Sequence, residues 1–220
     1  MHVLLDLDGT LLDPGAGLIA SIQYALKASG KAVPPAAELG WMIGPPLRAS
    51  FAQLLGGTEP AEAALAHYRA YYGARGMYEA IVYPGIPEAL DALAGAGCRL
   101  IVATAKPHHF ARPILKHFAL ADRFAAIHGP ELDGTRDAKA DLIAFILARE
   151  GVAVDAALMV GDRAVDVRAA RSNGMRSVAA AWGYGTRAEL SAAGAAAICE
   201  TPQALAALVL ALLGEGRRPR

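Results

Sequence analysis

The stretch Leu4-Leu5-Asp6-Leu7-Asp8-Gly9-Thr10 lies close to the first residue of the chain. The apolar run Val3–Leu7 predicts a short buried strand, with Asp6 and Asp8 at its carboxyl end. Side chains two positions apart project to the same side of a strand, and ligands of open α/β sheets bind beyond the carboxyl ends of the strands. Two carboxylates held this close repel each other unless a cation lies between them, which indicates an oxygen-liganded metal, above all Mg²⁺. Gly9 permits the turn that follows. The alternative is a polar strand end followed by a common Asp-Gly turn.

Further apolar runs recur along the chain, separated by segments in which apolar residues have helical spacing. The spacing is clear in 138–150, where Leu142, Ile143, Ile146 and Leu147 lie on one side. Strands buried on both faces by helices are typical of a parallel sheet. The sequence therefore predicts a doubly wound α/β fold with strands at Val3–Leu7, Leu100–Thr104, Ala125–His128, Ala157–Val160 and Ser177–Ala181.

One interval interrupts this alternation. From about Gly15 to about Tyr78 the spacing is only helical, which predicts an inserted all-helical domain. We expect residues 1–14 and 80–220 to form the α/β core and residues 15–79 to form the insert. The turn Val82–Gly85 returns the chain to the core. The tail Gly214–Arg220 is expected to be disordered.

A third carboxylate follows a second predicted strand, in Gly161-Asp162-Arg163-Ala164-Val165-Asp166. Asp162 can complete the metal site that Asp6 and Asp8 begin. Asp166 lies four positions after Asp162, so the two can share one face of a helix start. A simple role of Asp162 in capping a helix is the competing interpretation.

Residues at two other places in the chain can recognise a phosphate group. Thr104 ends an apolar run, and Pro107 follows as a helix opener, so the Thr104 hydroxyl and the amides around Ala105 would face an anion at a helix start. Lys139 begins another predicted helix and can place a cation on the same group. Lys106 can reach the same anion, although a solvated lysine at a helix start is an equally good interpretation of Lys106.

Composition excludes several classes of protein. The chain has 220 residues, with 21 Lys+Arg against 21 Asp+Glu, and this balance gives no electrostatic footprint for nucleic acid or an anionic membrane. The longest aliphatic run, Ala204–Leu213, is about half a membrane span. Cys98 and Cys199 are far apart and are expected to be buried reduced thiols. An apolar strand that begins almost at Met1 argues against a signal peptide, so we expect a cytoplasmic protein.

With these residues together, the chain resembles the haloacid dehalogenase superfamily, in its phosphoglycolate-phosphatase-like branch with a helical cap. The matching positions are Asp6-Leu7-Asp8-Gly9-Thr10, Thr104, Lys139 and Gly161–Asp166, and with the cap the resemblance covers residues 1 to about 213. It implies that Asp6 is a nucleophile that becomes an aspartyl phosphate and that Asp8 is the general acid and base. It also implies that Asp6, Asp162 and the backbone carbonyl of Asp8 hold Mg²⁺, with Asp166 orienting Lys139 or a metal-bound water.

The resemblance also indicates where substrate contacts lie. Gly9, Ala105 and Lys106 would contact substrate from the core. Similar proteins carry a specificity loop at the position of Ile43–Arg48, where two prolines would stiffen the chain and hold Arg48 over the active site. A plain connector between helices is the alternative for this loop.

We therefore expect a Mg²⁺-dependent phosphatase whose partner is a small phosphorylated metabolite, such as 2-phosphoglycolate or a nucleoside 5′-monophosphate. The first alternative is a sugar phosphomutase similar to β-phosphoglucomutase, which shares this core and cap, although no acid/base pair placed for it is evident in the cap. The second is a non-catalytic metal-binding domain. The expected assembly is a monomer or a homodimer.

Overall fold

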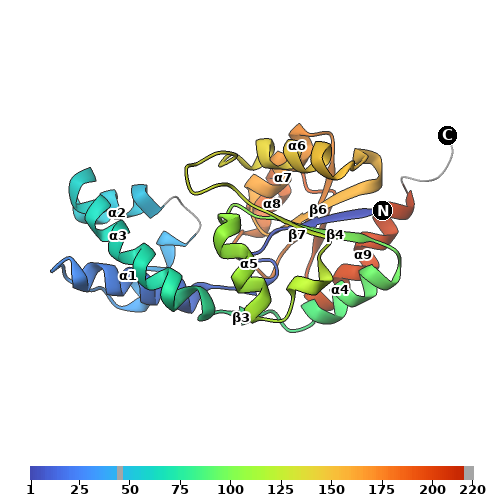
Figure 1. Ribbon diagram of the computed structural model, residues 1–220. Helices are drawn as coiled ribbons and strands as arrows, with labels where there is room; N and C mark the ends of the chain where they lie inside the picture. The colour runs from blue at the N-terminus through green and yellow to red at the C-terminus, as the bar shows by residue number, and fades with distance from the viewer. Residues whose placement is uncertain (44–46, 216–220) are drawn as a thin grey trace. The chain divides into compact units, whose positions relative to one another are not determined.

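The computed structural model describes residues 1–43 and 47–215. Its contacts divide the chain into two compact units, one made of Met1–Asp13 with the chain from Val82 onward, and one made of Pro14–Ile81 (Figure 1). The boundaries expected from the sequence, after residues 14 and 79, differ from these by one and two residues.

A parallel six-stranded sheet forms the centre of the larger unit. Its strand order is β5-β4-β1-β6-β7-β8, and β1 lies between β4 and β6 with Leu4 opposite Ile101 and Met159. The predicted α/β fold with a parallel sheet is confirmed. The strands are β1 (His2–Leu5), β4 (Arg99–Ala103), β5 (Ala126–His128), β6 (Ala157–Gly161), β7 (Arg176–Ala180) and β8 (Ala197–Cys199).

Helices cover both faces of this sheet, as Figure 1 shows for α6 and α7 on one face and α4 and α9 on the other. On the α6 side, Leu142, Ile143 and Ile146 pack on Leu4 and Met159 in a fully buried cluster. This burial removes apolar surface from water and supplies the main driving force for folding. The helices are α4 (Ile86–Gly95), α5 (His108–His117), α6 (Lys139–Glu150), α7 (Ala164–Ser172), α8 (Arg187–Ala193) and α9 (Pro202–Glu215), with short 3₁₀ turns at Ala121–Arg123 and Val154–Ala156.

The smaller unit is built from helices in its described residues, apart from Ile81 at its boundary. The helices are α1 (Gly15–Ala28), α2 (Leu47–Leu55) and α3 (Thr58–Ala74), with 3₁₀ turns at Ala36–Glu38, Gly40–Met42 and Gly76–Tyr78. Both α1 and α2 pack on α3, and Ile22, Phe51 and Leu65 are buried in this unit. A Cβ on Gly17 would lie 1.9 Å from the carbonyl oxygen of Gly76, so this packing requires a glycine.

Several details differ from the sequence-based expectations. Strand β1 ends at Leu5, before Asp6. The edge strand β8 was not predicted, because its three residues follow the run Ala195-Ala196, which has no β-branched or aromatic residue to mark a strand. The strands β2 (Leu12–Asp13) and β3 (Ile81–Val82), which pair with each other, were missed because two residues are too few for a pattern. The tail prediction was wrong for Gly214 and Glu215, which belong to α9, and residues 216–220 lie outside the described part of the chain.

Two further expectations concern the membrane and the cysteines. In residues 1–43 and 47–215, every helix is too short or too polar to span a lipid bilayer. Cys98 and Cys199 are both buried and unpaired, as the sequence predicted.

Candidate active site

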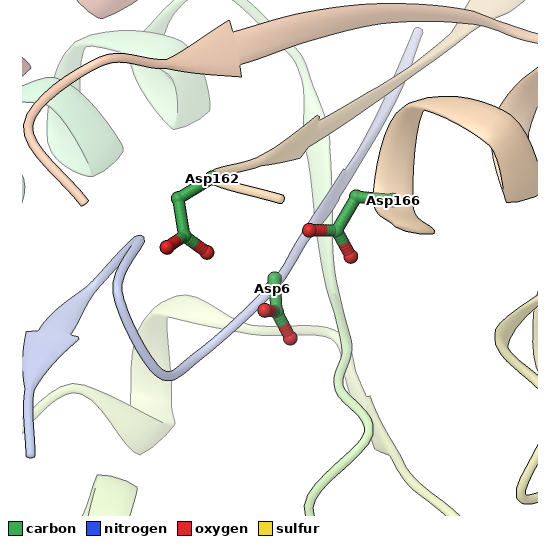
Figure 2. Close-up of side chains that lie close together, drawn as sticks. All are labelled: Asp6, Asp162 and Asp166. Carbon is green, nitrogen blue, oxygen red and sulfur yellow. The ribbon is translucent and has the colours of Figure 1, made fainter. Parts of the chain in front are cut away.

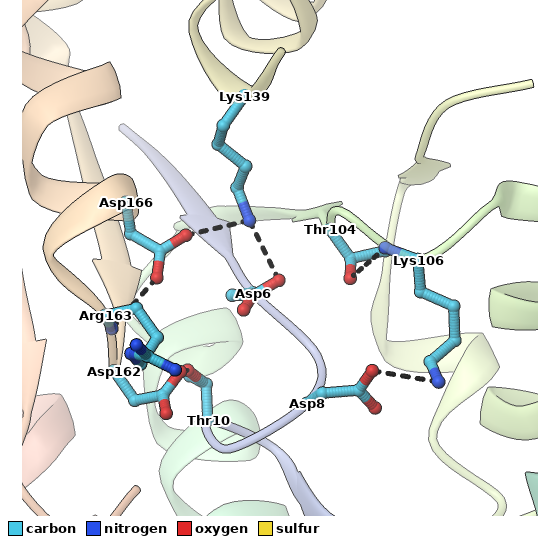
Figure 3. Close-up of polar contacts among 9 residues, drawn as sticks. All are labelled: Asp6, Asp8, Thr10, Thr104, Lys106, Lys139, Asp162, Arg163 and Asp166. Carbon is cyan, nitrogen blue, oxygen red and sulfur yellow. Dashed lines mark hydrogen bonds and ion pairs between the residues drawn. The ribbon is translucent and has the colours of Figure 1, made fainter. Parts of the chain in front are cut away.

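The predicted site residues of the core meet at one edge of the sheet, because parallel strands end at the same edge. Asp6 follows β1, Thr104 follows β4 and Asp162 follows β6, and these three strands are neighbours in the order β4-β1-β6. Lys139 is the first residue of α6, which packs over this part of the sheet. Figure 3 shows how their side chains converge.

Lys139 connects two buried carboxylates. Its Nζ atom lies 2.9 Å from Asp6 Oδ1 and 2.8 Å from Asp166 Oδ1, and only 4% of the residue is exposed. Burial opposes the lysine charge, but attraction and hydrogen bonding to Asp166 and Asp6 outweigh it and raise the pKa of Lys139. Lys139 therefore stays charged and holds the Asp6 carboxylate in one orientation.

Asp166 uses both of its oxygens inside the protein. Oδ1 pairs with Lys139, and Oδ2 accepts a hydrogen bond of 3.1 Å from the backbone N–H of Arg163 at the start of α7. Burial raises the pKa of Asp166 to about 6, although the Lys139 charge acts against the shift. This arrangement suits a residue that orients Lys139.

Asp162 is fully buried and is held from two sides. Its Oδ2 accepts a 2.8 Å hydrogen bond from the backbone N–H of Tyr184, and its Oδ1 lies 3.4 Å from the Thr10 hydroxyl, which donates to it. Gly9 passes so close, at φ +82°, that a Cβ there would lie 2.2 Å from Asp162 Oδ2. Burial, reinforced by the Asp6 charge, raises the pKa of Asp162 to about 7.

Asp6, Asp162 and Asp166 form a compact acidic cluster (Figure 2). Each offers one oxygen, and these oxygens all lie within 4.8 Å of one another. Lys139 is paired with two of the three carboxylates, and the Asp6 charge adds to the effect of burial in raising the pKa values of Asp162 and Asp166. A divalent cation with oxygen ligands would offset this negative charge, so the residues present fit Mg²⁺. Among the described residues, the Asp8 carboxylate is not in this cluster.

Asp8 contacts a different cation from Asp6. Lys106 Nζ lies 2.9 Å from Asp8 Oδ2, on the other side of the loop from Lys139 (Figure 3). Burial raises the pKa of the Asp8 carboxyl, and the Lys106 charge opposes this. The sequence predicted that Asp6 and Asp8 project to the same side of a strand. This was wrong, because β1 ends at Leu5 and neither aspartate belongs to it.

Thr104 lies between the two lysine contacts. It is 1% exposed, and its hydroxyl oxygen accepts a 3.1 Å hydrogen bond from the backbone N–H of Lys106. The hydroxyl can donate its own proton to an anion beside it. Ala105 lies in the short loop between Thr104 and α5.

Arg48 lies in the smaller unit, near the start of α2. Its guanidinium Nε is 2.5 Å from Glu62 Oε1, and 61% of the Arg48 side chain is exposed. Residues 44–46 of the expected specificity loop lie outside the described residues. A substrate contact from Arg48 therefore stays a prediction.

Two groups that orient Asp162 were not predicted from the sequence. They are the Thr10 side chain and the backbone amide of Tyr184. A backbone donor has no residue-type signature, but the pattern Trp182-Gly183-Tyr184-Gly185 directly after β7 carried a signal. Glycines at a strand end mark close approach of the backbone to another group.

The fold and the site together define a class: a doubly wound α/β enzyme with a buried aspartate, a lysine and further carboxylates at the carboxyl edge of its sheet. A family model described as haloacid dehalogenase-like hydrolase matches residues 3–180. The chain belongs to this family, as the resemblance implied.

Three curated proteins are similar in sequence to this chain. A protein named 5′-nucleotidase from Pseudomonas aeruginosa is 46% identical over 192 residues, which cover 87% of each chain. A protein named tyrosine-protein kinase PtkA from Mycobacterium bovis is 40% identical over 83% of this chain and 62% of its own length. A phosphoglycolate phosphatase from Agrobacterium fabrum is 34% identical over 82% of this chain and 80% of its own.

A solved structure agrees in fold with almost all of the chain. The crystal structure of a predicted phosphatase from Clostridium acetobutylicum superposes with a TM-score of 0.87 at 39% identity, covering 96% of this chain and 98% of that one.

Proposed function

We propose that this haloacid dehalogenase-type phosphatase hydrolyses a small phosphorylated metabolite through a phosphoryl group carried on Asp6, with Mg²⁺ at the acidic cluster. The observation that carries the proposal is the contact of Lys139 with Asp6 and Asp166 beside Asp162. Among the described residues, this arrangement places an oriented carboxylate next to a fixed cation and an unsatisfied excess of negative charge.

The metal would be held by Asp6 and Asp162 together with the backbone carbonyl of Asp8. It would supply positive charge that draws the substrate phosphate to Asp6 and disperses charge as the phosphoryl group transfers. Asp166 is proposed to orient Lys139 or a metal-bound water and not to bind the metal itself. Its two oxygens already contact Lys139 and the Arg163 amide.

Asp6 is the proposed nucleophile. One of its carboxylate oxygens forms a bond to the substrate phosphorus as the bond from phosphorus to the ester oxygen breaks. Lys139 holds the carboxylate in place and offsets its repulsion of the phosphate. The Thr104 hydroxyl and the amides near Ala105 are proposed to bind the phosphate oxygens, and Gly9 lets the backbone approach them.

Asp8 is the proposed general acid and base. Its carboxyl group gives a proton to the leaving ester oxygen, and the resulting carboxylate then takes a proton from the water that attacks the aspartyl phosphate. A carboxyl pKa raised by burial suits the first step. Lys106, paired with Asp8, can position it and can also reach a substrate.

The unit Pro14–Ile81 is proposed to be a cap that selects the substrate, with Arg48 as a contact. Candidate substrates are 2-phosphoglycolate and nucleoside 5′-monophosphates, and the names of two relatives support them. The expectations of a monomer or homodimer and of a cytoplasmic location stay predictions.

Chemical trapping tests the phosphorylated Asp6 directly. The enzyme is mixed with a substrate that it hydrolyses, and the reaction is quenched with acid. Borohydride then reduces an aspartyl phosphate to homoserine, and mass spectrometry of the tryptic peptides locates it. We expect homoserine at position 6 and unmodified aspartate at position 8. Turnover with Asp6 unmodified would contradict the proposal.

The mutase alternative predicts a different product from the same intermediate. A sugar phosphomutase returns the phosphoryl group to the sugar, so it converts a sugar 1-phosphate to the 6-phosphate without free phosphate. A coupled assay of both products decides between the two. A non-catalytic domain would give neither product and no label on Asp6.

A further inference from the structure

The segment between β7 and α8 contacts Asp162 at several points, although nothing in the proposed chemistry uses it. This segment is the Trp182–Gly185 turn. The backbone N–H of Tyr184 donates to Asp162 Oδ2 at 2.8 Å. A Cβ on Gly183 would lie 2.3 Å from both Asp162 Cβ and the carbonyl oxygen of Gly9, and a Cβ on Gly185 would lie 2.0 Å from the carbonyl oxygen of Asp162. The turn therefore lies directly against the backbone and side chain of Asp162.

Two side chains anchor this turn to the segment that follows Asp6. The indole N–H of Trp182 donates to the carbonyl oxygen of Thr10 at 3.0 Å. The Tyr184 hydroxyl donates to Asp13 Oδ1, at the end of β2. Asp13 is the last residue of the larger unit before the chain enters the smaller one. A continuous set of hydrogen bonds thus runs from Asp13 through Tyr184 to Asp162.

We infer that Tyr184 and Asp13 are positioning residues for the metal site: the bond between them fixes the Trp182–Gly185 turn, so that the Tyr184 amide holds the Asp162 carboxylate in its metal-binding orientation. The inference rests on the proposed function, because it assumes that Asp162 binds Mg²⁺. Groups that orient metal ligands without touching the metal commonly change metal affinity when they are removed.

The Asp162 carboxylate is held less firmly on its other side. Its other oxygen is 3.4 Å from the Thr10 hydroxyl, a long and therefore weak hydrogen bond. The Tyr184 amide provides the shorter contact of the two, and it can do so only while the turn is in place. Without the bond to Asp13, the turn keeps the Trp182 anchor but loses the one that acts at Tyr184 itself.

Magnesium affinity tests the inference without relying on activity. Full-length wild type, Tyr184→Phe, Asp13→Ala and the double variant are stripped with EDTA and titrated with Mg²⁺ by calorimetry, and their thermal midpoints are measured in EDTA. Tyr24→Phe is the control for removal of a tyrosine hydroxyl, because Tyr24 is an exposed tyrosine of the smaller unit whose ring stacks on Tyr71.

We expect Tyr184→Phe and Asp13→Ala each to weaken Mg²⁺ binding about tenfold. We expect the double variant to bind Mg²⁺ about as weakly as each single variant, because the two substitutions remove the same hydrogen bond. Tyr24→Phe should bind Mg²⁺ as the wild type does. A structural role alone would lower the thermal midpoint in EDTA and leave the affinity of the folded protein unchanged.

Three outcomes would overturn the inference. If both single variants bind Mg²⁺ with wild-type affinity, neither residue positions Asp162, while the proposed phosphatase function stands. If the losses of Mg²⁺ affinity multiply in the double variant, the two residues act independently and not through one hydrogen bond. If the wild type itself binds no Mg²⁺, the proposed metal site fails and the inference fails with it.

Discussion

At the scale of single residues, the site depends on which cation faces which carboxylate. Lys139 forms ion pairs with Asp6 and Asp166, whereas Lys106 forms one with Asp8. This separation gives the two aspartates of the Asp-x-Asp pattern different surroundings, although they are only two residues apart. Different surroundings allow one carboxylate to act as a nucleophile and the other to carry a proton.

Asp8→Asn tests the proton-carrying role. The amide cannot protonate the leaving oxygen, so we expect turnover of an alkyl phosphate to fall by about 10²- to 10⁴-fold. The loss should be smaller for p-nitrophenyl phosphate, because its leaving group departs without a proton. Steady-state rates on the two substrates measure the difference. Equal losses on both would argue against a general acid at Asp8.

Lys139→Ala tests the buried ion pairs. The change leaves Asp6 and Asp166 without their shared cation, and breaking a buried pair in this way costs about 3–5 kcal/mol of unfolding free energy. Urea unfolding in EDTA near neutral pH measures the loss. Lys116→Ala, on the exposed side of α5, is the matched control and should change little. A loss no greater than that of the control would mean that the pair does not stabilise the fold.

At the scale of elements, three strand ends and one helix start bring the site together. The sequence predicted this for Asp6, Thr104, Asp162 and Lys139, because apolar runs followed by polar residues reveal the carboxyl ends of strands. It did not predict the orientation of Asp8, because the end of β1 depends on ladder pairing and not on residue type. Nor did it predict the Tyr184 contact, which is made by a backbone amide.

Gly183→Ala tests the close packing of the Trp182–Gly185 turn on Asp162. The added methyl group would meet Asp162 Cβ and the Gly9 carbonyl, both at 2.3 Å, and overpacking of this kind costs about 1–3 kcal/mol. We expect lower stability in urea and weaker Mg²⁺ binding in calorimetry. Gly95→Ala, at the end of α4 with no atom near its Cβ position, should have neither effect. Unchanged Mg²⁺ binding in Gly183→Ala would show that the turn can move without disturbing Asp162.

At the scale of the whole molecule, the sequence predicted two units and the helical nature of the second, because only helical spacing is found from about Gly15 to about Tyr78. Substrate choice could not be predicted in the same way. In the proposed function it depends on individual side chains such as Arg48, whose partner Glu62 lies fourteen positions away on α3. Charge pairs of this kind leave no periodic pattern in a sequence.

Stability should depend on metal and pH together. The pKa of Asp162 is raised to about 7 and that of Asp166 to about 6, whereas both ionise near 4 in an unfolded chain. The unfolded state therefore loses its protons first, and the metal-free protein becomes less stable as the pH rises from about 4 to about 7. Mg²⁺ should restore this loss, so its effect on the thermal midpoint should be larger at about pH 8 than at about pH 5. An equal or smaller effect at the higher pH would contradict the charge assignment.

Phosphate release tests the central claim most directly. The wild type and Asp6→Asn are assayed on a panel of phosphorylated metabolites that includes 2-phosphoglycolate and nucleoside 5′-monophosphates, each with Mg²⁺ and with EDTA. We predict release that requires Mg²⁺, favours one compound and falls by about 10³-fold or more in Asp6→Asn. Circular dichroism verifies that the variant is folded. Release that persists in folded Asp6→Asn, or that is unaffected by EDTA, would contradict a metal-assisted phosphoryl transfer to Asp6.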